Sequence, residues 1–247
     1  MLGDTLCRHG HWLFRWRGQA PFVLVPLVLL AIHDSAAAYQ RLGAFADAAW
    51  ELACVALAGL GVLLRAYIVG HAPRGTSGRN TSRQEAATLN VTGMYSVARH
   101  PLYLANFLIF LGLILFPSVV WFACAAIPLY WLYYERIMLA EEEFLAAEFG
   151  AAYRDYAART PAVMPNFRLW TRPAMPFCLR TVLRREYSGL LLFFAGFAVM
   201  EMSEAFLLQR AYEAYLAPGA ALAVGLALFL ALRTLKRHTL LLRVEGR

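Results

Sequence analysis

The stretch "AAWELACVALAGLGVLLRAYIV", Ala48 to Val69, decides the fold class of this chain. Its only charged residues are Glu51 and Arg65, which lie toward its two ends. A helix needs about 20 predominantly apolar residues to cross the hydrocarbon core of a bilayer, and this stretch has that length. It therefore predicts a membrane-spanning helix.

Further apolar stretches of similar length lie on both sides of this one. Of the 247 residues, 60% are apolar and 16% are charged, which is too apolar for one soluble domain. We expect the additional spans at 19–38, 101–116, 118–137, 188–208 and 212–232. The predicted fold is all-α: one polytopic integral membrane helical bundle over 1–247, with about six transmembrane helices and a cytoplasmic amphipathic helix.

The basic residues divide unequally between the two sides of this bundle. With the N-terminus in the cytoplasm, all of the 23 Lys and Arg residues except Arg41 and Arg210 fall on cytoplasmic segments. The positive-inside rule therefore places both termini and the main polar segments in the cytoplasm. The net charge of +7 is then explained by the orientation of the protein in the membrane and by contact with anionic lipid headgroups, not by nucleic-acid binding. The alternative is a first span cleaved as a signal peptide; we expect it to be retained.

The four cysteines, Cys7, Cys54, Cys124 and Cys178, do not have the spacing of metal ligands. At least two of them fall in apolar segments. We therefore expect neither a disulfide nor a metal site.

A polar feature, "TGMYSVARHPLYLAN" (residues 92–106), stands at the mouth of the third span. Pro101 suits the first turn of a helix, and His100, restricted by that proline, lies just outside it. The first backbone N–H groups of this helix are then expected to be free, which together with Arg99 makes an anion site. Taken alone, the stretch is equally typical of an interfacial anchor, with Tyr103 in the aromatic belt.

The segment "AEEEFLAAEFGAAYRDYAAR" (residues 140–159) predicts an amphipathic helix. One face of that helix is expected to carry Glu142, Leu145, Phe149, Tyr153 and Tyr156. Glu142 would then lie in an apolar stripe, where a carboxylate must find a cation or several hydrogen-bond donors, or else be neutral. The alternative is a membrane-interface helix with one partly solvated glutamate.

Together the two stretches resemble the isoprenylcysteine carboxyl methyltransferase and phospholipid methyltransferase family. The matching residues are Gly93, Tyr95, Arg99, His100, Pro101 and Tyr103 in the first motif, and Glu141, Glu142, Leu145, Phe149, Gly150, Tyr153, Tyr156, Arg159, Pro161 and Pro165 in the second. The resemblance covers about 50–168, a methyltransferase core with cofactor motifs at 93–106 and 141–165. It leaves 188–232 as two additional transmembrane helices.

The resemblance implies an integral membrane enzyme that uses S-adenosylmethionine. The residues it implies for cofactor binding are Arg99, His100, Pro101, Tyr103, Leu104, Asn106, Glu141 and Glu142. In that picture Arg99 and His100 suit the methionyl carboxylate, and Glu142 suits the amino group. Tyr103 could face the sulfonium. No strand-borne glycine fingerprint is present, which excludes the soluble Rossmann type of methyltransferase.

An acceptor that is already anionic needs no general base, so we expect methylation of an anionic lipid oxygen. The loop "APRGTSGRNTSRQ" offers Arg74, Arg79, Asn80 and Arg83 for phosphate recognition, or for headgroup anchoring alone. This loop and the later "LRREYSG" resemble the bacterial branch that methylates the 1-phosphate of lipid A, which implies the bacterial inner membrane. Arg159 is expected to orient the acceptor, and Arg159 and Glu142 are the predicted catalytic residues.

Three other functions stay open at this point. The same fold could methylate a prenylcysteine carboxylate or a phosphatidylethanolamine nitrogen. A membrane reductase that uses NADPH is a further alternative, against which the pair Glu141 and Glu142 argues. A transporter would need polar residues at mid-span, where these spans are nearly apolar. The expected partners are a membrane lipid and the bilayer, with no nucleic acid and no protein partner implied.

Overall fold

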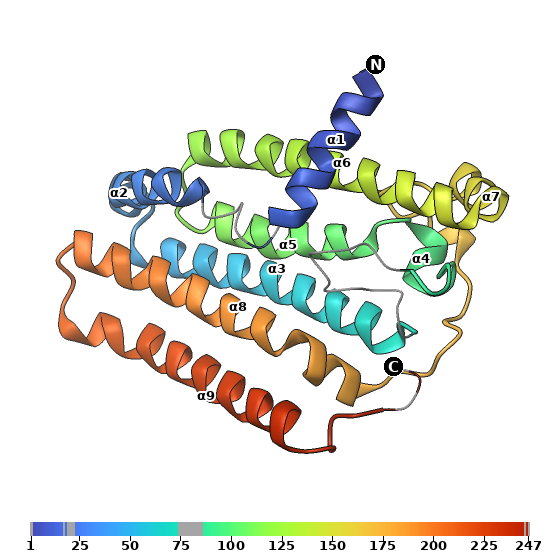
Figure 1. Ribbon diagram of the computed structural model, residues 1–247. Coiled ribbons are helices and arrows are strands. Elements are labelled where there is room, and N and C mark those ends of the chain that lie inside the picture. The colour runs from blue at the N-terminus through green and yellow to red at the C-terminus, as the bar shows by residue number, and fades with distance from the viewer. Residues whose placement is uncertain (1, 17, 19–22, 74–85, 245, 247) are drawn as a thin grey trace.

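The computed structural model describes residues 2–16, 18, 23–73, 86–244 and 246, and every regular element in that part of the chain is a helix (Figure 1). The α-helices are α1 (Leu2–Trp16), α2 (Val25–Leu42), α3 (Ala44–His71), α4 (Met94–Val97), α5 (Pro101–Leu115), α6 (Val120–Phe149), α7 (Ala151–Arg159), α8 (Leu179–Leu207) and α9 (Leu216–His238). Two short 3-10 helices are η2 (Phe167–Leu169) and η3 (Tyr212–Tyr215). The predicted all-α fold class is confirmed.

Three helical segments of the described chain are long and apolar enough to cross a membrane. They are Phe45–His71 in α3, the whole of α8, and Tyr212–His238, which contains α9. Two apolar helices, Val25–Ser35 and α5, are shorter. α6 has 30 residues, or about 45 Å at 1.5 Å per residue, so it extends well past the predicted span 118–137. The chain is therefore a helical membrane protein, and six crossings stay a prediction.

Small residues let α3 and α5 approach each other closely. A Cβ atom added at Gly61 would lie 2.7 Å from the carbonyl oxygen of Ala105, and one at Gly112 would lie 2.4 Å from that of Cys54. Ala58 and Ala105 are fully buried at this interface. Because apolar side chains gain little by leaving lipid, close backbone packing is a main source of helix association in a membrane. This packing fixes α5, the helix of the first motif, on α3.

The helix α1 is an element that the sequence analysis did not predict. It crosses α6 so closely that a Cβ atom at Gly10 would lie 2.0 Å from the carbonyl oxygen of Arg136 (Figure 1). Phe14 is buried in the same contact, beside Tyr134 and Ile137 of α6. The helix was missed because its apolar residues alternate with Arg and His and do not form a run of membrane length.

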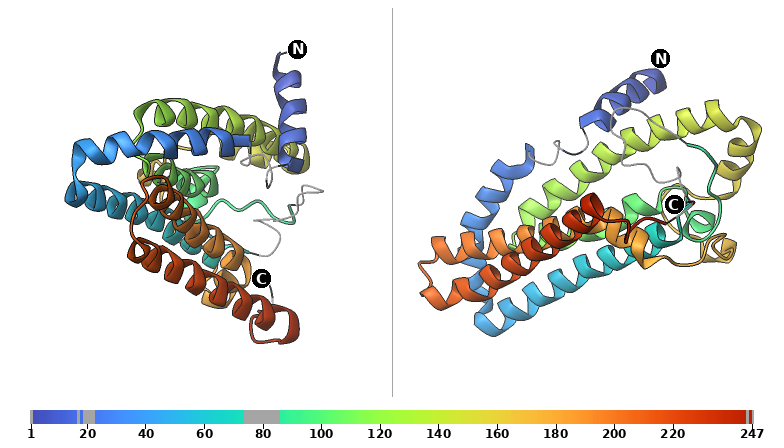
Figure 2. Two further views of the ribbon diagram at one scale, coloured as in Figure 1. Left: turned by 90° about the vertical axis from the view of Figure 1, so that its left-hand side faces the viewer. Right: turned by 60° about the horizontal axis from the view of Figure 1, so that its bottom comes forward.

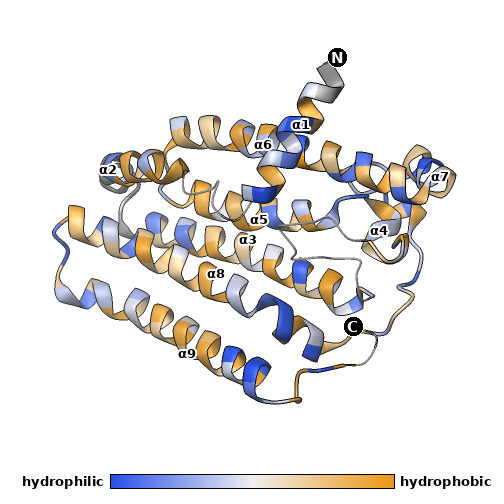
Figure 3. Ribbon diagram, in the orientation of Figure 1, coloured by the Kyte–Doolittle hydropathy of each residue, from blue (hydrophilic) through white to orange (hydrophobic). Residues whose placement is uncertain are grey.

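Charged residues lie at both ends of α8. Hydrophilic residues gather at the start of α8 and the end of α9, which pack side by side (Figures 2 and 3). At the other end of α8, Arg210 lies 3.3 Å from Glu204, 3.4 Å from Glu201 and 3.7 Å from Asp47 of α3. Arg210 is one of the two basic residues that the charge distribution left outside the cytoplasm, and these carboxylates neutralise it.

Candidate active site

Gly93 opens the first motif with a backbone conformation that favours glycine. Its φ is 62° and its ψ is −133°. The Gly93 N–H donates to the carbonyl oxygen of Thr171 at 3.1 Å, and its carbonyl oxygen accepts from the Ser96 hydroxyl at 2.7 Å. The chain then enters α5 with His100 as the residue before the helix and Pro101 as its first residue, so the predicted helix start is confirmed.

The second motif is not one continuous helix. Gly150, with φ 55° and ψ −123°, ends α6 and separates it from α7. The predicted single amphipathic helix over 140–159 is therefore wrong, because the positive φ at Gly150 interrupts the helical period. Tyr153 and Tyr156 are still buried, since α7 packs on the first motif: the Tyr156 hydroxyl donates to the carbonyl oxygen of Tyr95 at 2.7 Å.

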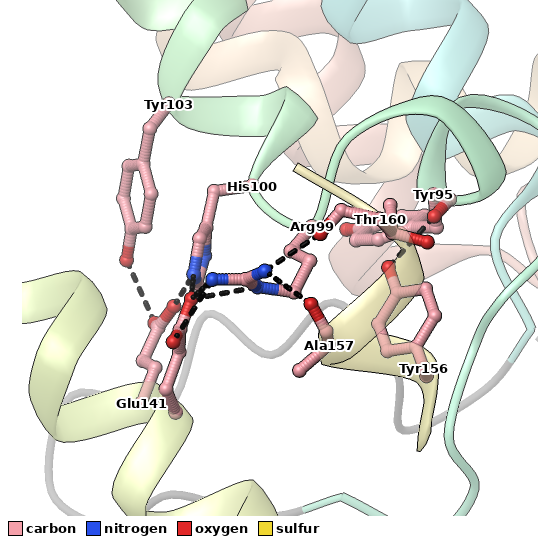
Figure 4. A network of polar contacts seen from close by, with 9 residues as sticks. Tyr95, Arg99, His100, Tyr103, Glu141, Tyr156, Ala157 and Thr160 are labelled. Atoms are coloured by element: carbon pink, nitrogen blue, oxygen red, sulfur yellow. Dashed lines mark hydrogen bonds and ion pairs between the residues drawn. The ribbon is translucent and has the colours of Figure 1, made fainter. Parts of the chain in front are cut away.

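Arg99 joins the two motifs with hydrogen bonds from all three guanidinium nitrogens (Figure 4). Nε donates to Glu142 Oε1 at 2.9 Å, and Nη2 donates to Glu142 Oε2 at 3.2 Å. Nη1 donates to the carbonyl oxygens of Ala157 at 2.9 Å and Thr160 at 2.6 Å. A paired, two-pronged contact of this kind is the strongest that arginine makes with a carboxylate. Arg99 therefore holds Glu142 and the end of α7 together.

The carboxylates of Glu141 and Glu142 face different nitrogens of the His100 ring. His100 Nε2 lies 2.8 Å from Glu142 Oε1, and Nδ1 lies 3.7 Å from Glu141 Oε2. The Tyr103 hydroxyl donates to Glu141 Oε1 at 2.7 Å (Figure 4). The partners that the sequence analysis required for Glu142 are thus Arg99 and His100, both from the first motif.

These contacts set the ionisation of the site. Burial opposes ionisation of Glu142, but hydrogen bonds from His100 and Arg99 outweigh it and lower the pKa of the Glu142 carboxyl group below the ordinary 4.5. Burial, with the Glu142 charge adding to it, raises the pKa of the Tyr153 hydroxyl, and burial likewise raises the pKa of Tyr156. At neutral pH the site therefore holds an ionised Glu142 beside two protonated phenols.

The backbone at the start of α5 differs from the prediction of free N–H groups. The N–H groups of Tyr103 and Leu104 both donate to the carbonyl oxygen of His100, at 3.1 and 3.4 Å. The N–H of Arg99 donates to Pro161 at 2.8 Å, and that of His100 donates to the carbonyl oxygen of residue 162 at 2.9 Å. The prediction of free N–H groups is therefore wrong at Tyr103 and Leu104, because the first helical turn satisfies them, and the segment after α7 accepts from the N–H groups of Arg99 and His100.

Asn106 contacts a charged pair that the sequence analysis did not identify. Arg65 of α3 donates through Nη1 to the side-chain oxygen of Asn106. The same guanidinium donates to both oxygens of Glu186 of α8, at 3.0 and 3.1 Å. The sequence did indicate that Arg65 needs a partner, because it is the only cation in its apolar stretch. The partner, Glu186, could not be identified, because it lies 121 residues further along the chain.

The other predicted site residues are dispersed. Pro101 is fully buried at the start of α5, and Leu104 follows it on the same helix, half-buried. Arg159 is exposed at the end of α7, where its Nε donates to the carbonyl oxygen of Asp155 at 3.1 Å. The predicted substrate-binding residues Arg74, Arg79, Asn80 and Arg83 lie outside the described residues.

Three carboxylates far from the two motifs lie close enough together to hold a cation. One ligand atom from each of Asp47, Glu51 and Glu204 lies within 4.8 Å of the others. The cysteine spacing predicts no metal site, and it carries no information on carboxylates that the packing of α3 on α8 brings together. Arg210 pairs with Asp47 and Glu204, so a cation already occupies part of this cluster.

The fold and the site together define a class of protein: a helical membrane protein in which a charged cluster joins two motifs of a polytopic bundle. Within that class, residues 51–152 match the phospholipid methyltransferase family, which confirms the resemblance carried by the two motifs. The matched region contains Arg99, His100, Glu141 and Glu142.

Two curated relatives are similar over part of the same region. The nickel-cobalt-cadmium resistance protein NccN of Alcaligenes xylosoxydans xylosoxydans is 34% identical over 89 residues, which is 36% of this chain and 41% of the relative. The cobalt-zinc-cadmium resistance protein CzcN of Cupriavidus metallidurans is 36% identical over 83 residues, 34% of this chain and 38% of the relative. The chain thus spans about two fifths of each of these relatives. No solved structure matches it.

Proposed function

We propose that this protein is an S-adenosylmethionine-dependent methyltransferase that acts on an anionic oxygen of a membrane lipid. The observation that carries the proposal is the cluster of Arg99, His100 and Glu142, which joins the two motifs inside the family match. Buried charges at a membrane protein's polar end are expensive, and their concentration in one place is typical of a functional site.

The residues of the cluster fit this cofactor chemically. The cofactor carries an ammonium group, a carboxylate and a sulfonium-bound methyl group, and it supplies that methyl group as an electrophile. The carboxylate of Glu141, which accepts from the neutral Tyr103 hydroxyl, suits the ammonium. The Tyr103 ring packs 4.8 Å from the Tyr134 ring and 5.7 Å from the His100 ring, and aromatic faces of this kind attract a sulfonium.

Glu142 has a different task in this proposal. Arg99 and His100 already contact the Glu142 carboxylate, so Glu142 orients these two side chains and the proposed cofactor contact falls to Glu141. Arg99 in turn fixes the carbonyl groups at the end of α7. The predicted catalytic Glu142 therefore acts as a residue that holds the site in shape.

The acceptor is proposed to be an anionic lipid headgroup, with the 1-phosphate of lipid A as the preferred candidate. Arg159 is exposed at the end of α7 and directly precedes Thr160, whose carbonyl oxygen Arg99 holds. Among its described contacts the Arg159 side chain bonds only to the backbone of its own helix, so in this proposal it turns toward an acceptor without breaking an ion pair. An acceptor that is already ionised needs only alignment and exclusion of water at this position.

Two measurements on the full chain in detergent test the proposal. Isothermal titration calorimetry with S-adenosylmethionine should give a saturable isotherm, and absence of binding would refute the methyltransferase. Methyl-labelled cofactor is then incubated with total lipid extract, and the labelled lipids are separated. Label on lipid A supports the preferred acceptor, whereas label on phosphatidylethanolamine derivatives alone would replace it with nitrogen methylation.

A further inference from the structure

Arg65 occupies the junction of three helices. It lies on α3 and makes a paired contact with both carboxylate oxygens of Glu186 on α8, at 3.0 and 3.1 Å. Its remaining terminal nitrogen donates to the side-chain oxygen of Asn106 on α5. The Arg65 and Glu186 side chains are 21% and 10% exposed, so this pair is largely shielded from solvent. Removing one partner of such a pair leaves an uncompensated charge, so breaking the pair is costly.

This contact fixes the orientation of the Asn106 side-chain amide. A guanidinium group has donors only, so the atom of Asn106 that faces Arg65 must be the oxygen. The amide oxygen is thereby engaged, and the group left for any other partner is NH₂, a donor. Asn106 therefore offers a hydrogen bond to an acceptor, and Arg65 prevents the opposite orientation.

Asn106 lies close to the cluster that we assign to the cofactor. It follows Tyr103 by three residues on α5, so the two side chains point from neighbouring positions of one helix. The Tyr95 hydroxyl feels charges from both sides, from Glu141 of the cluster and from Arg65. Burial raises the pKa of this hydroxyl, the charge of Glu141 raises it further, and the charge of Arg65 lowers it. Arg65 and Glu141 thus act on the same buried hydroxyl.

We propose that Arg65 and Glu186 are positioning residues of the active site, which hold the Asn106 amide so that its NH₂ group donates to an acceptor atom of the cofactor. This inference rests on the proposed function. It gives α8 a part in the site, although α8 lies outside the matched region 51–152. Glu186 fixes Arg65, Arg65 fixes Asn106, and Asn106 contacts the ligand.

The test compares three variants of the full chain in detergent, by calorimetry with S-adenosylmethionine and by thermal unfolding. Asn106→Asp keeps an oxygen for Arg65 but replaces the NH₂ donor with an acceptor. We expect its melting temperature to be retained and its Kd to rise about tenfold or more. Glu186→Gln weakens the hold on Arg65, and we expect a smaller rise in Kd together with a lower melting temperature.

Arg210→Gln is the matched control, because it removes the cation that pairs with Asp47 of α3 and Glu204 of α8 at the opposite ends of these helices. It should lower the melting temperature and leave the Kd unchanged. If Asn106→Asp binds like the wild type, or if Arg210→Gln weakens binding as much as Glu186→Gln does, the positioning role is refuted while the proposed function stands. A wild-type chain that does not bind the cofactor refutes both.

Discussion

Arg99 and Glu142, 43 residues apart in the sequence, form a paired hydrogen bond at 2.9 and 3.2 Å. One end of this contact lies just before α5 and the other lies in the last third of α6. At this end of the bundle the Tyr103 hydroxyl contacts Glu141 and the His100 ring contacts Glu142, whereas the apolar contacts of the two helices include those of Tyr130 and Phe107. The contact between Arg99 and Glu142 therefore helps to set the spacing of the two motifs.

Glu142→Gln should destabilise the protein and weaken cofactor binding. The substitution removes the charge that Arg99 and His100 face, and a largely buried guanidinium loses a charged acceptor at a cost of about 2 kcal/mol. Thermal unfolding and calorimetry in detergent measure both effects. The control is Glu143→Gln, which removes an exposed neighbouring carboxylate and should change neither quantity. Equal behaviour of the two variants would contradict the structural role of Glu142.

The stability difference between the wild type and Glu142→Gln should depend on pH. The folded-state pKa of Glu142 is lower than its ordinary value of 4.5, so its ionised form stabilises the fold above that value. This stabilisation is lost as the pH falls through the lowered folded-state pKa. The gap in melting temperature should therefore be full near neutral pH and should narrow below about pH 4.5. A gap that stays constant on acidification would show that the charge of Glu142 does not contribute.

Gly150→Ala should destabilise the junction of α6 and α7. The φ of Gly150 is 55°, which places a Cβ atom in a left-handed conformation that costs about 1–2 kcal/mol for other residues. Gly59→Ala is a matched control, because neither glycine has an atom within 4 Å of an added Cβ and only Gly150 has a positive φ. Gly59→Ala should be neutral or stabilising by up to about 1 kcal/mol in the interior of α3. Similar melting temperatures for the two variants would argue against the strained turn.

Tyr153→Phe and Tyr156→Phe should differ in their effect on the free energy of unfolding, although the two residues lie on one short helix. The Tyr156 hydroxyl donates to Tyr95 at 2.7 Å, so its removal should destabilise by about 1 kcal/mol. The Tyr153 hydroxyl is buried and makes no hydrogen bond of normal geometry with a described residue, although Arg99 lies near enough to act on its pKa, so its removal should cost less than that of the Tyr156 hydroxyl. Denaturant or thermal unfolding of the two variants side by side measures the difference.

The parts of this architecture that the sequence predicts are those set by local rules. Pro101 marks the start of α5 because proline fixes the backbone of its own residue and restricts the one before it. The period of the second motif placed Glu142, Tyr153 and Tyr156 on one side, yet it could not show that Gly150 interrupts the helix. The spacing of apolar residues is the same on both sides of Gly150, so the sequence pattern does not show where the helix is interrupted.

Contacts between distant segments could not be predicted in the same way. Elementary electrostatics predicts that a buried Glu142 carboxylate needs a cation. That this cation is Arg99, and not a group of a bound ligand, depends on how α7 packs on the first motif. Arg65 likewise stands in an apolar run, and only the packing of α3 on α8 pairs it with Glu186. The match of residues 51–152 supports the motifs themselves, whereas the roles proposed for individual side chains rest on these contacts and on the measurements above.

Arg159→Ala should lower turnover and leave cofactor binding intact. The Arg159 side chain is exposed and bonds only to the backbone of Asp155 among its described contacts, so its loss should not disturb the cluster around Arg99. If it orients an anionic headgroup, removing a charge-assisted contact should lower kcat by about tenfold or more at an unchanged Kd for S-adenosylmethionine. The matched control is Arg154→Ala, an exposed arginine on the same helix, which should keep full turnover. A parallel loss of turnover and cofactor affinity in Arg159→Ala would instead place this guanidinium on the cofactor, because an acceptor contact cannot change binding measured without an acceptor.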